Sequence, residues 1–180
     1  MWLRLLIGGL ALAALPGPAS AQAGERLVSP ALPGFVLGHS AGNSQQSIRE
    51  EVPAGETVQA WTRMVTTQRF VGLAARATVA AYARNILASL PRSCPGATAS
   101  PITGLTVSGR PAARIQVDCP RSAGGQPETF ILLAVAGTSD MHVKQIALRG
   151  GTTPAGLAWG RSFLSGTTFC AAGSRARACR

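Results

Sequence analysis

One stretch of the sequence has the letters of a serine nucleophile motif. Residues 38–42 read Gly-His-Ser-Ala-Gly, which matches G-x-S-x-G, and residues 35–37 before them form a short apolar run. A serine hydroxyl becomes a nucleophile when a histidine accepts its proton and an acidic side chain orients that histidine. Asp140 and His142 follow Ser40 in the order Ser, Asp, His. These three residues are the candidate catalytic set.

The motif resembles the nucleophile elbow of the α/β-hydrolases, in which the serine stands on a strained turn between a strand and a helix. The surrounding sequence argues against that activity. Too little chain precedes Ser40 to form the earlier strands of a hydrolase sheet, and residues 43–46, with Pro53 close behind, do not read as a helix. We therefore expect a glycine-rich hairpin turn over residues 38–47 and keep an esterase-like serine hydrolase as an alternative.

Residues 1–21 have the three parts of a secretory signal peptide. Arg4 supplies the positive charge, residues 5–15 are apolar, and residues 19–21 read Ala-Ser-Ala, a small-x-small cleavage site. The apolar run is shorter than the roughly 20 residues that span a bilayer. No later stretch is long and apolar enough to do so. We expect a periplasmic or secreted protein with no transmembrane segment in its mature part.

The chain has four cysteines, and an even number in an exported protein indicates disulfides. Three pairings are open, and we favour Cys94 with Cys119 and Cys170 with Cys179 because the members of each pair are close in sequence. A metal site is not expected, since no two cysteines have C-x-x-C spacing and neither histidine is near a cysteine. No cofactor-binding motif is expected either.

The chain is basic, with 17 Lys and Arg against 7 Asp and Glu and a formal net charge of +10. Such a balance is compatible with an acidic partner. The arginines are scattered, however, and lack the aromatic interleaving of nucleic-acid binders, so we expect no nucleic acid partner. Arg175, Arg177 and Arg180 gather in the tail. A second alternative function is therefore the binding of anionic surfaces through this tail.

The pattern of apolar residues predicts one domain. We expect an irregular lead-in over residues 22–34, a single domain over 35–170 and a basic tail over 171–180. Residues 57–70 fit both helical spacing and a β-branched strand, and we predict a strand. The clearest helix is expected over residues 73–90, with Pro91 as its stop. Further strands are expected over residues 101–107, 113–119, 129–136 and 141–149, and a short helix should begin at Thr153 and Pro154.

These elements predict an α+β fold. We expect one antiparallel sheet of about six or seven strands, with a long middle helix and a short C-terminal helix packed on it. Along residues 113–119 the alternation is clean: the odd-numbered side chains are apolar, and Arg114, Gln116 and Asp118 point the other way.

Residues 51–56 and residues 61–66 resemble a segment of small uncharacterised secreted bacterial proteins, and the order of strands and helices resembles a Mog1/PsbP-like sandwich. This resemblance implies a binding or accessory protein without catalytic residues. Trp61 and Arg63 form a candidate recognition pair, although a tryptophan is more often buried in a core. We expect an exported, soluble, non-enzymatic protein of the bacterial cell envelope whose partner is an unknown protein or envelope component.

Overall fold

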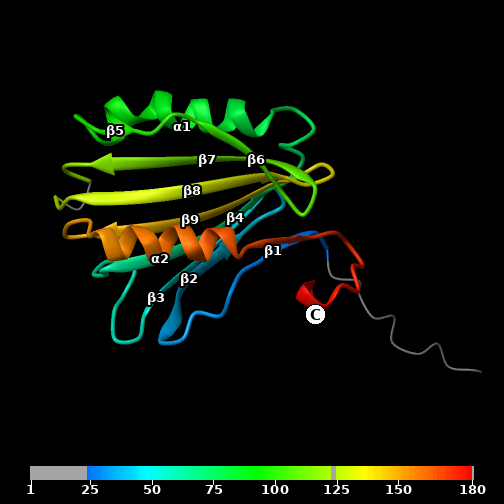
Figure 1. The fold of residues 1–180 in the computed structure, drawn as a ribbon, viewed down its shortest axis with the longest axis horizontal. Helices are drawn as coiled ribbons and strands as arrows, with labels where there is room; N and C mark the ends of the chain where they lie inside the picture. The colour runs from blue at the N-terminus through cyan, green and yellow to red at the C-terminus, as the bar shows by residue number, and fades with distance from the viewer. Residues whose placement is uncertain (1–23, 123–124, 180) are drawn as a thin grey trace, which may run out of the picture.

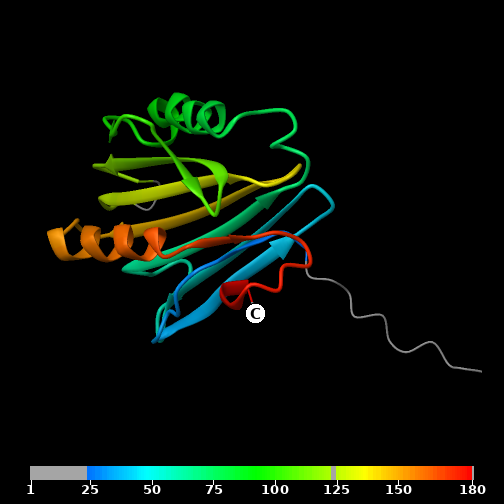
Figure 2. The same ribbon diagram turned by 45° about the vertical axis from the view of Figure 1, so that its right-hand side comes forward.

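A computed structural model of the chain describes residues 24–122 and 125–179. They form two antiparallel sheets, one of eight strands and one of two strands. In the large sheet the strand order is β2 (Phe35–Gly42), β3 (Gln46–Pro53), β4 (Arg63–Phe70), β9 (Met141–Arg149), β8 (Glu128–Ala136), β7 (Arg110–Cys119) and β5 (Thr98–Ala99), with β6 (Thr103–Val107) also paired to β7. The sheet is strongly twisted, so that β2 and β3 run obliquely to β7 and β8 (Figure 2).

Two helices cover opposite faces of the large sheet. Helix α1 (Val79–Ser93) packs on the side chains of Ile115, Leu132 and Val143, which form one core cluster. Helix α2 (Pro154–Ser165) packs on Ile131 and other residues that alternate with those side chains and form a second cluster. Figure 1 shows α2 lying across the middle strands, while α1 lies beyond β7. We call these the α1 face and the α2 face.

The two ends of the described chain close part of the α2 face. Strand β1 (Arg26–Val28) pairs with β10 (Thr168–Cys170) in the small sheet, and β10 leads into the 3-10 helix η1 (Arg177–Cys179). Leu27 and Phe169 from this small sheet pack against the same core cluster as α2. Segments far apart in sequence therefore complete the packing that α2 leaves open (Figure 1).

The predicted architecture is wrong. The described residues are mostly β, with ten strands in two antiparallel sheets rather than about six or seven in one sheet. Both helices are short, with 15 residues in α1 and 12 in α2. The predicted pairing of a long middle helix with a short C-terminal helix is therefore wrong. The sequence pattern missed β1 and β10 because three-residue strands show too little alternation to detect.

Several boundaries also differ from the predicted ones. The expected turn over residues 38–47 is mostly strand, because β2 continues to Gly42. Thr78 caps α1 by accepting a hydrogen bond from the N–H of Ala81, so the helix begins six residues later than expected, and Pro91 lies within its last turn. In residues 57–70 only the second half is a strand. The predicted start of α2 is confirmed, with Thr153 as N-cap and Pro154 in the first turn.

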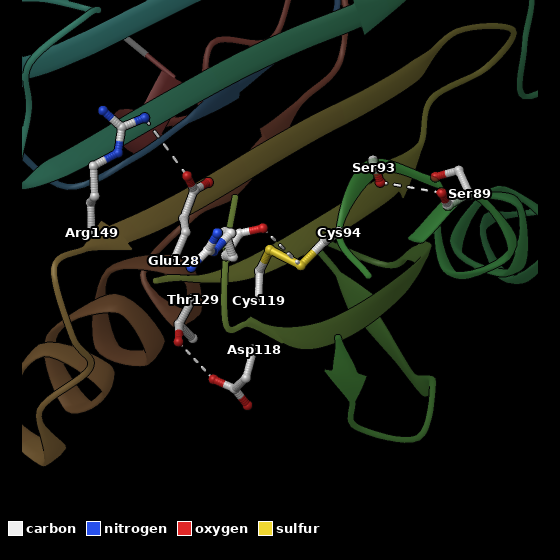
Figure 3. Close-up of a disulfide and its surroundings, with 9 residues drawn as sticks. Ser89, Ser93, Cys94, Asp118, Cys119, Glu128, Thr129 and Arg149 are labelled. Carbon is white, nitrogen blue, oxygen red and sulfur yellow. Dashed lines mark hydrogen bonds and ion pairs between the residues drawn. A yellow bond between two sulfur atoms is a disulfide. The ribbon is translucent and has the colours of Figure 1, made fainter. Parts of the chain in front are cut away.

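Both favoured disulfides are confirmed, Cys94–Cys119 and Cys170–Cys179. The first ties the end of α1 to the end of β7, and Figure 3 shows it between these elements. The second closes the segment after β10 into a loop that includes η1. The expected tail is thus attached to the small sheet by a covalent bond.

We predict that replacing Cys94 and Cys119 together by serine lowers the free energy of unfolding by roughly 3 kcal/mol, because the unfolded chain then loses its cross-link. Urea denaturation followed by circular dichroism measures this. The matched control replaces Cys170 and Cys179, which close a shorter loop and should cost somewhat less. Unchanged stability in the first variant would contradict the expected contribution of this disulfide.

Candidate functional site

The three residues of the candidate catalytic set do not come together. Ser40 lies on edge strand β2, where it pairs with Arg49, and the same row of the sheet continues through Thr67 to Lys144. His142 lies on β9, separated from β2 by two strands. Strands lie about 4.8 Å apart, so the separation across the sheet is roughly 14 Å. A serine hydroxyl at that distance cannot pass its proton to His142.

Asp140 instead has a structural role. Its carboxylate accepts hydrogen bonds from the N–H of Gly72 at 2.8 Å and from Nε of Arg69 at 2.7 Å. Burial alone would raise the pKa of Asp140, but these hydrogen bonds hold it below its ordinary value. The carboxylate joins the loop before α1 to the start of β9.

His142 is enclosed by the chain ends. Its side chain is 4% exposed, and its ring meets that of Phe169 edge-on with centroids 5.5 Å apart. Its Nε2 has no hydrogen-bond partner and lies 3.8 Å from a carboxylate oxygen of Glu25. Burial lowers the pKa of His142, although the carboxylates of Glu25 and Asp140 oppose that effect. This histidine is a packing residue rather than a base facing solvent.

The structure separates the two candidate recognition residues. Trp61 is 7% exposed and packs against Val52, Met64 and Ala147 on the α1 face. Arg63 begins β4 opposite Leu148, which belongs to the core cluster on the α2 face. The candidate pair is therefore not a single patch, and Trp61 is a core residue.

The side chain that Trp61 contacts is Arg149. The Arg149 guanidinium carbon lies 3.8 Å from the Trp61 ring centroid, its Nη1 donates to the carbonyl of Gln59, and its Nη2 is 3.8 Å from Glu128. Figure 3 shows Arg149 and Glu128 side by side near the disulfide. Burial raises the pKa of Glu128, and the charge of Arg149 counteracts it. The positive charge of Arg149 is therefore paired with groups of the protein itself.

Arg63 lies at a cleft between the start of β4, the end of β9 and the first turn of α2. The cleft has a volume of about 410 Å³, and Thr62, Leu148, Thr153 and Trp159 are among its walls. Of the described residues that line it, none is acidic. We call it the Arg63 cleft.

A stack of aromatic rings supports Arg63. Its guanidinium carbon lies 5.5 Å from the Trp159 ring centroid, within the range of a cation–π contact. Trp159 stacks on Phe35 at 5.9 Å and lies 6.1 Å from Phe163. Arg63 is exposed and has no hydrogen bond or ion pair within the part of the chain that the structure describes. Its charge is therefore held in place and open to a ligand.

Sequence reasoning missed Lys144. It is the single lysine of a chain that otherwise uses arginine, yet it is 5% exposed in the middle of β9. Its Nζ donates to Oγ1 of Thr67 at 2.6 Å, and burial lowers its pKa to about 8. The sequence signal for this residue was a lone lysine within an apolar strand pattern. A lysine can be buried there more readily than an arginine, because an amine can lose its proton and a guanidinium cannot.

The basic tail is not a free extension. Arg177 lies in η1, inside the loop that the Cys170–Cys179 disulfide closes, while Arg180 lies outside the described residues. Arg26 from β1 donates a hydrogen bond to the carbonyl of Cys179.

Within residues 24–122 and 125–179, no group of three or more His, Cys, Asp or Glu side chains lies close enough together to hold a metal ion. In the same ranges, neither helix has the length and apolarity of a membrane span.

No protein-family model matches this chain, and no curated protein matches its sequence. Among solved structures the chain is similar to PA94 from Pseudomonas aeruginosa, which is described as a protein of unknown function and a candidate regulator. The TM-score is 0.46 and the identity 13%, over 84% of this chain and 83% of the other. A similarity of this size assigns neither a family nor a function. The resemblance to a Mog1/PsbP-like fold stays a prediction.

We predict that Lys144→Met raises the free energy of unfolding at pH 7 by on the order of 1–3 kcal/mol, because it removes a buried charge whose surroundings do not neutralise it fully. In the wild type, the unfolded chain binds more protons than the folded chain between the folded pKa of about 8 and the ordinary value of 10.5. Stability should therefore rise with pH in that window and fall as pH drops through about 8.

Urea denaturation between pH 7 and 10 measures this dependence, since burial raises the pKa of Tyr82 to about 12 and its opposite effect begins only above its ordinary value of 10. Lys144→Met should lose the rise, and Arg84→Met on the exposed side of α1 should keep it. A rise of equal size in the Lys144 variant would show that another group causes it.

Proposed function

We propose that this chain is an exported, non-enzymatic binding or accessory protein of the bacterial cell envelope. Two disulfides support an oxidising compartment, because such bonds persist outside the reducing cytoplasm. The expected signal peptide, residues 1–21, agrees with this proposal but lies outside the described residues. Periplasmic and secreted destinations are both consistent with it.

The Arg63 cleft is the observation that carries the proposed binding role. It combines the unpaired cation of Arg63, an aromatic platform and apolar walls, which is the usual make-up of a recognition site. Arg149, whose charge is paired with Glu128, also lines the cleft. Such a site fits an acidic side chain or carboxylate presented by a partner, because an arginine binds a carboxylate through two parallel hydrogen bonds. The partner we propose is an envelope protein or component with an exposed acidic group.

Catalysis has less support in the described residues. The nucleophile motif lies in an edge strand, its supposed base is buried two strands away, and Lys144 opens into none of the described cavities. The binding of anionic surfaces through the tail has no comparable support either, since the disulfide holds residues 170–179 in a closed loop.

We predict that a fluorophosphonate probe does not label Ser40 in the folded protein, because neither histidine can accept the proton of its hydroxyl. His142 lies two strands away, and His39, the residue before Ser40 on β2, points to the opposite face of the sheet. Intact mass spectrometry after incubation with the probe measures this, with Ser40→Ala as the control. A mass increase in the wild type that the Ser40→Ala variant lacks would restore the hydrolase alternative.

We predict that a short poly-glutamate peptide binds the wild type at low salt, and that Arg63→Gln weakens this binding about tenfold, since a charge-assisted hydrogen bond contributes that much or more. Isothermal titration calorimetry measures both affinities. Arg84→Gln is the matched control, because it removes an exposed arginine from α1 on the opposite face of the sheet.

The site is then checked by fluorescence. Binding should change the emission of Trp159, and Trp159→Phe should remove that change while Trp61 still emits. If Arg63→Gln and Arg84→Gln weaken binding equally, the peptide senses only net charge and the Arg63 cleft is not the binding site.

A further inference from the structure

A second groove lies on the α2 face, at the other end of α2 from the Arg63 cleft. It has a volume of about 360 Å³ and lies between the β6–β7 hairpin, the end of α2 and the start of β10. Leu105, Leu133 and Leu164 supply its apolar walls, and Arg114 is the one charged residue among the described residues that line it. This volume is at the lower end of the roughly 300–1,000 Å³ typical of small-molecule sites.

Arg114 is the polar anchor of this groove. It lies on β7, paired with Thr103 on one side and with the buried Leu133 on the other, and it is half-buried. Within residues 24–122 and 125–179 it makes no hydrogen bond or ion pair. Its neighbours along the same face are different, since Gln116 accepts a hydrogen bond from Arg161 and Asp118 accepts one from Thr129. A partly buried cation without a partner is costly, and an anionic ligand would remove that cost.

The wall of the groove is built with a strained residue. Ser108, in the turn of the β6–β7 hairpin, has φ of +49°, and Gly109 after it has φ of +76°. Two positive φ values suit a tight hairpin, but the first position usually carries Asn, Asp or Gly. Ser108 is used here because its Oγ accepts a hydrogen bond from the N–H of Phe169 at 3.0 Å. That bond ties β10 to the hairpin, and the groove lies between these two elements.

We propose that this groove is a binding site for a medium-chain aliphatic monocarboxylate. The carboxylate would bind the guanidinium of Arg114, and the alkyl chain would lie along Leu105, Leu133 and Leu164. The positive charge selects an anion, and the apolar walls select an alkyl chain. Among the described residues that line the groove Arg114 is the one cation, which favours a single carboxylate over a more highly charged group. The proposal does not depend on the Arg63 cleft.

The test is calorimetric titration of the whole exported protein with octanoate as the probe. We expect saturable binding to the wild type that salt weakens, and at least tenfold weaker binding to Arg114→Gln. Ser165→Tyr, at an exposed position on the rim, should fill the groove and also abolish binding. 1-Octanol, which has the same chain without the charge, should bind much more weakly than octanoate.

Two matched variants make the outcomes distinct. Arg92→Gln, in the exposed last turn of α1, and Arg63→Gln should both bind octanoate as the wild type does. Arg114→Gln should in turn bind poly-glutamate as the wild type does. Failure of the octanoate proposal can therefore be distinguished from failure of the proposed role of the Arg63 cleft. Thermal melts confirm that each variant is folded. The proposal is overturned if wild-type protein does not bind octanoate at millimolar concentration, or if Arg114→Gln binds it equally well.

Discussion

The alternation of side chains along β9 is the constraint on which the rest of this structure depends. β9 joins two groups of strands, because it pairs with β4 on one side and with β8 on the other. Its side chains are buried on both faces, so both faces need a cover. Helix α1 covers one face over β7 and β8, and Trp61 packs over Val52, Met64 and Ala147 on the same face. Helix α2 covers part of the other face over β8 and β9. β1 and β10 cover much of what α2 leaves open.

This division explains where the unusual polar groups lie. His142 and Lys144 alternate with Val143 along β9, so both point to the α2 face, where the chain ends and polar strand residues surround them. Glu25 comes from the chain just before β1, and Phe169 comes from β10. The two ends of the described chain are therefore part of the core packing, and the Cys170–Cys179 disulfide holds the second of them in place.

The sequence predicted those elements whose burial is set by local pattern. The central strands β7, β8 and β9, the capped start of α2 and the apolar stripe of α1 were all predicted, because each has several apolar positions at a regular spacing. The same reasoning missed β1, β5 and β10, which are too short for a pattern, and ended β2 after residues 35–37 because the glycines that follow suggested a turn. Their pairing is decided by strands distant in sequence, which a local pattern does not contain.

The candidate site was predicted less well, and the reasons are geometric. Ser40 and His142 had the right order in sequence, but strand order, which the sequence pattern does not specify, puts two strands between them. Trp61 and Arg63 were treated as neighbours on one strand, whereas Glu56 accepts hydrogen bonds from the backbone and side chain of Thr62 and the strand begins only at Arg63. The two side chains then lie on opposite faces.

The alternation along β7 predicts which face Arg114 lies on, but not whether that face is covered by another element. The pattern of β7 correctly put Arg114, Gln116 and Asp118 on one face, and such a face is usually taken to be in water. Here that face lies under α2, so each polar side chain needs a partner inside the fold. Gln116 and Asp118 have one, and Arg114 does not. Helix α2 and the two ends of the described chain leave gaps over this face, and both the Arg63 cleft and the groove at Arg114 open on it. A ligand can therefore reach a charge there without disturbing the apolar packing under α1.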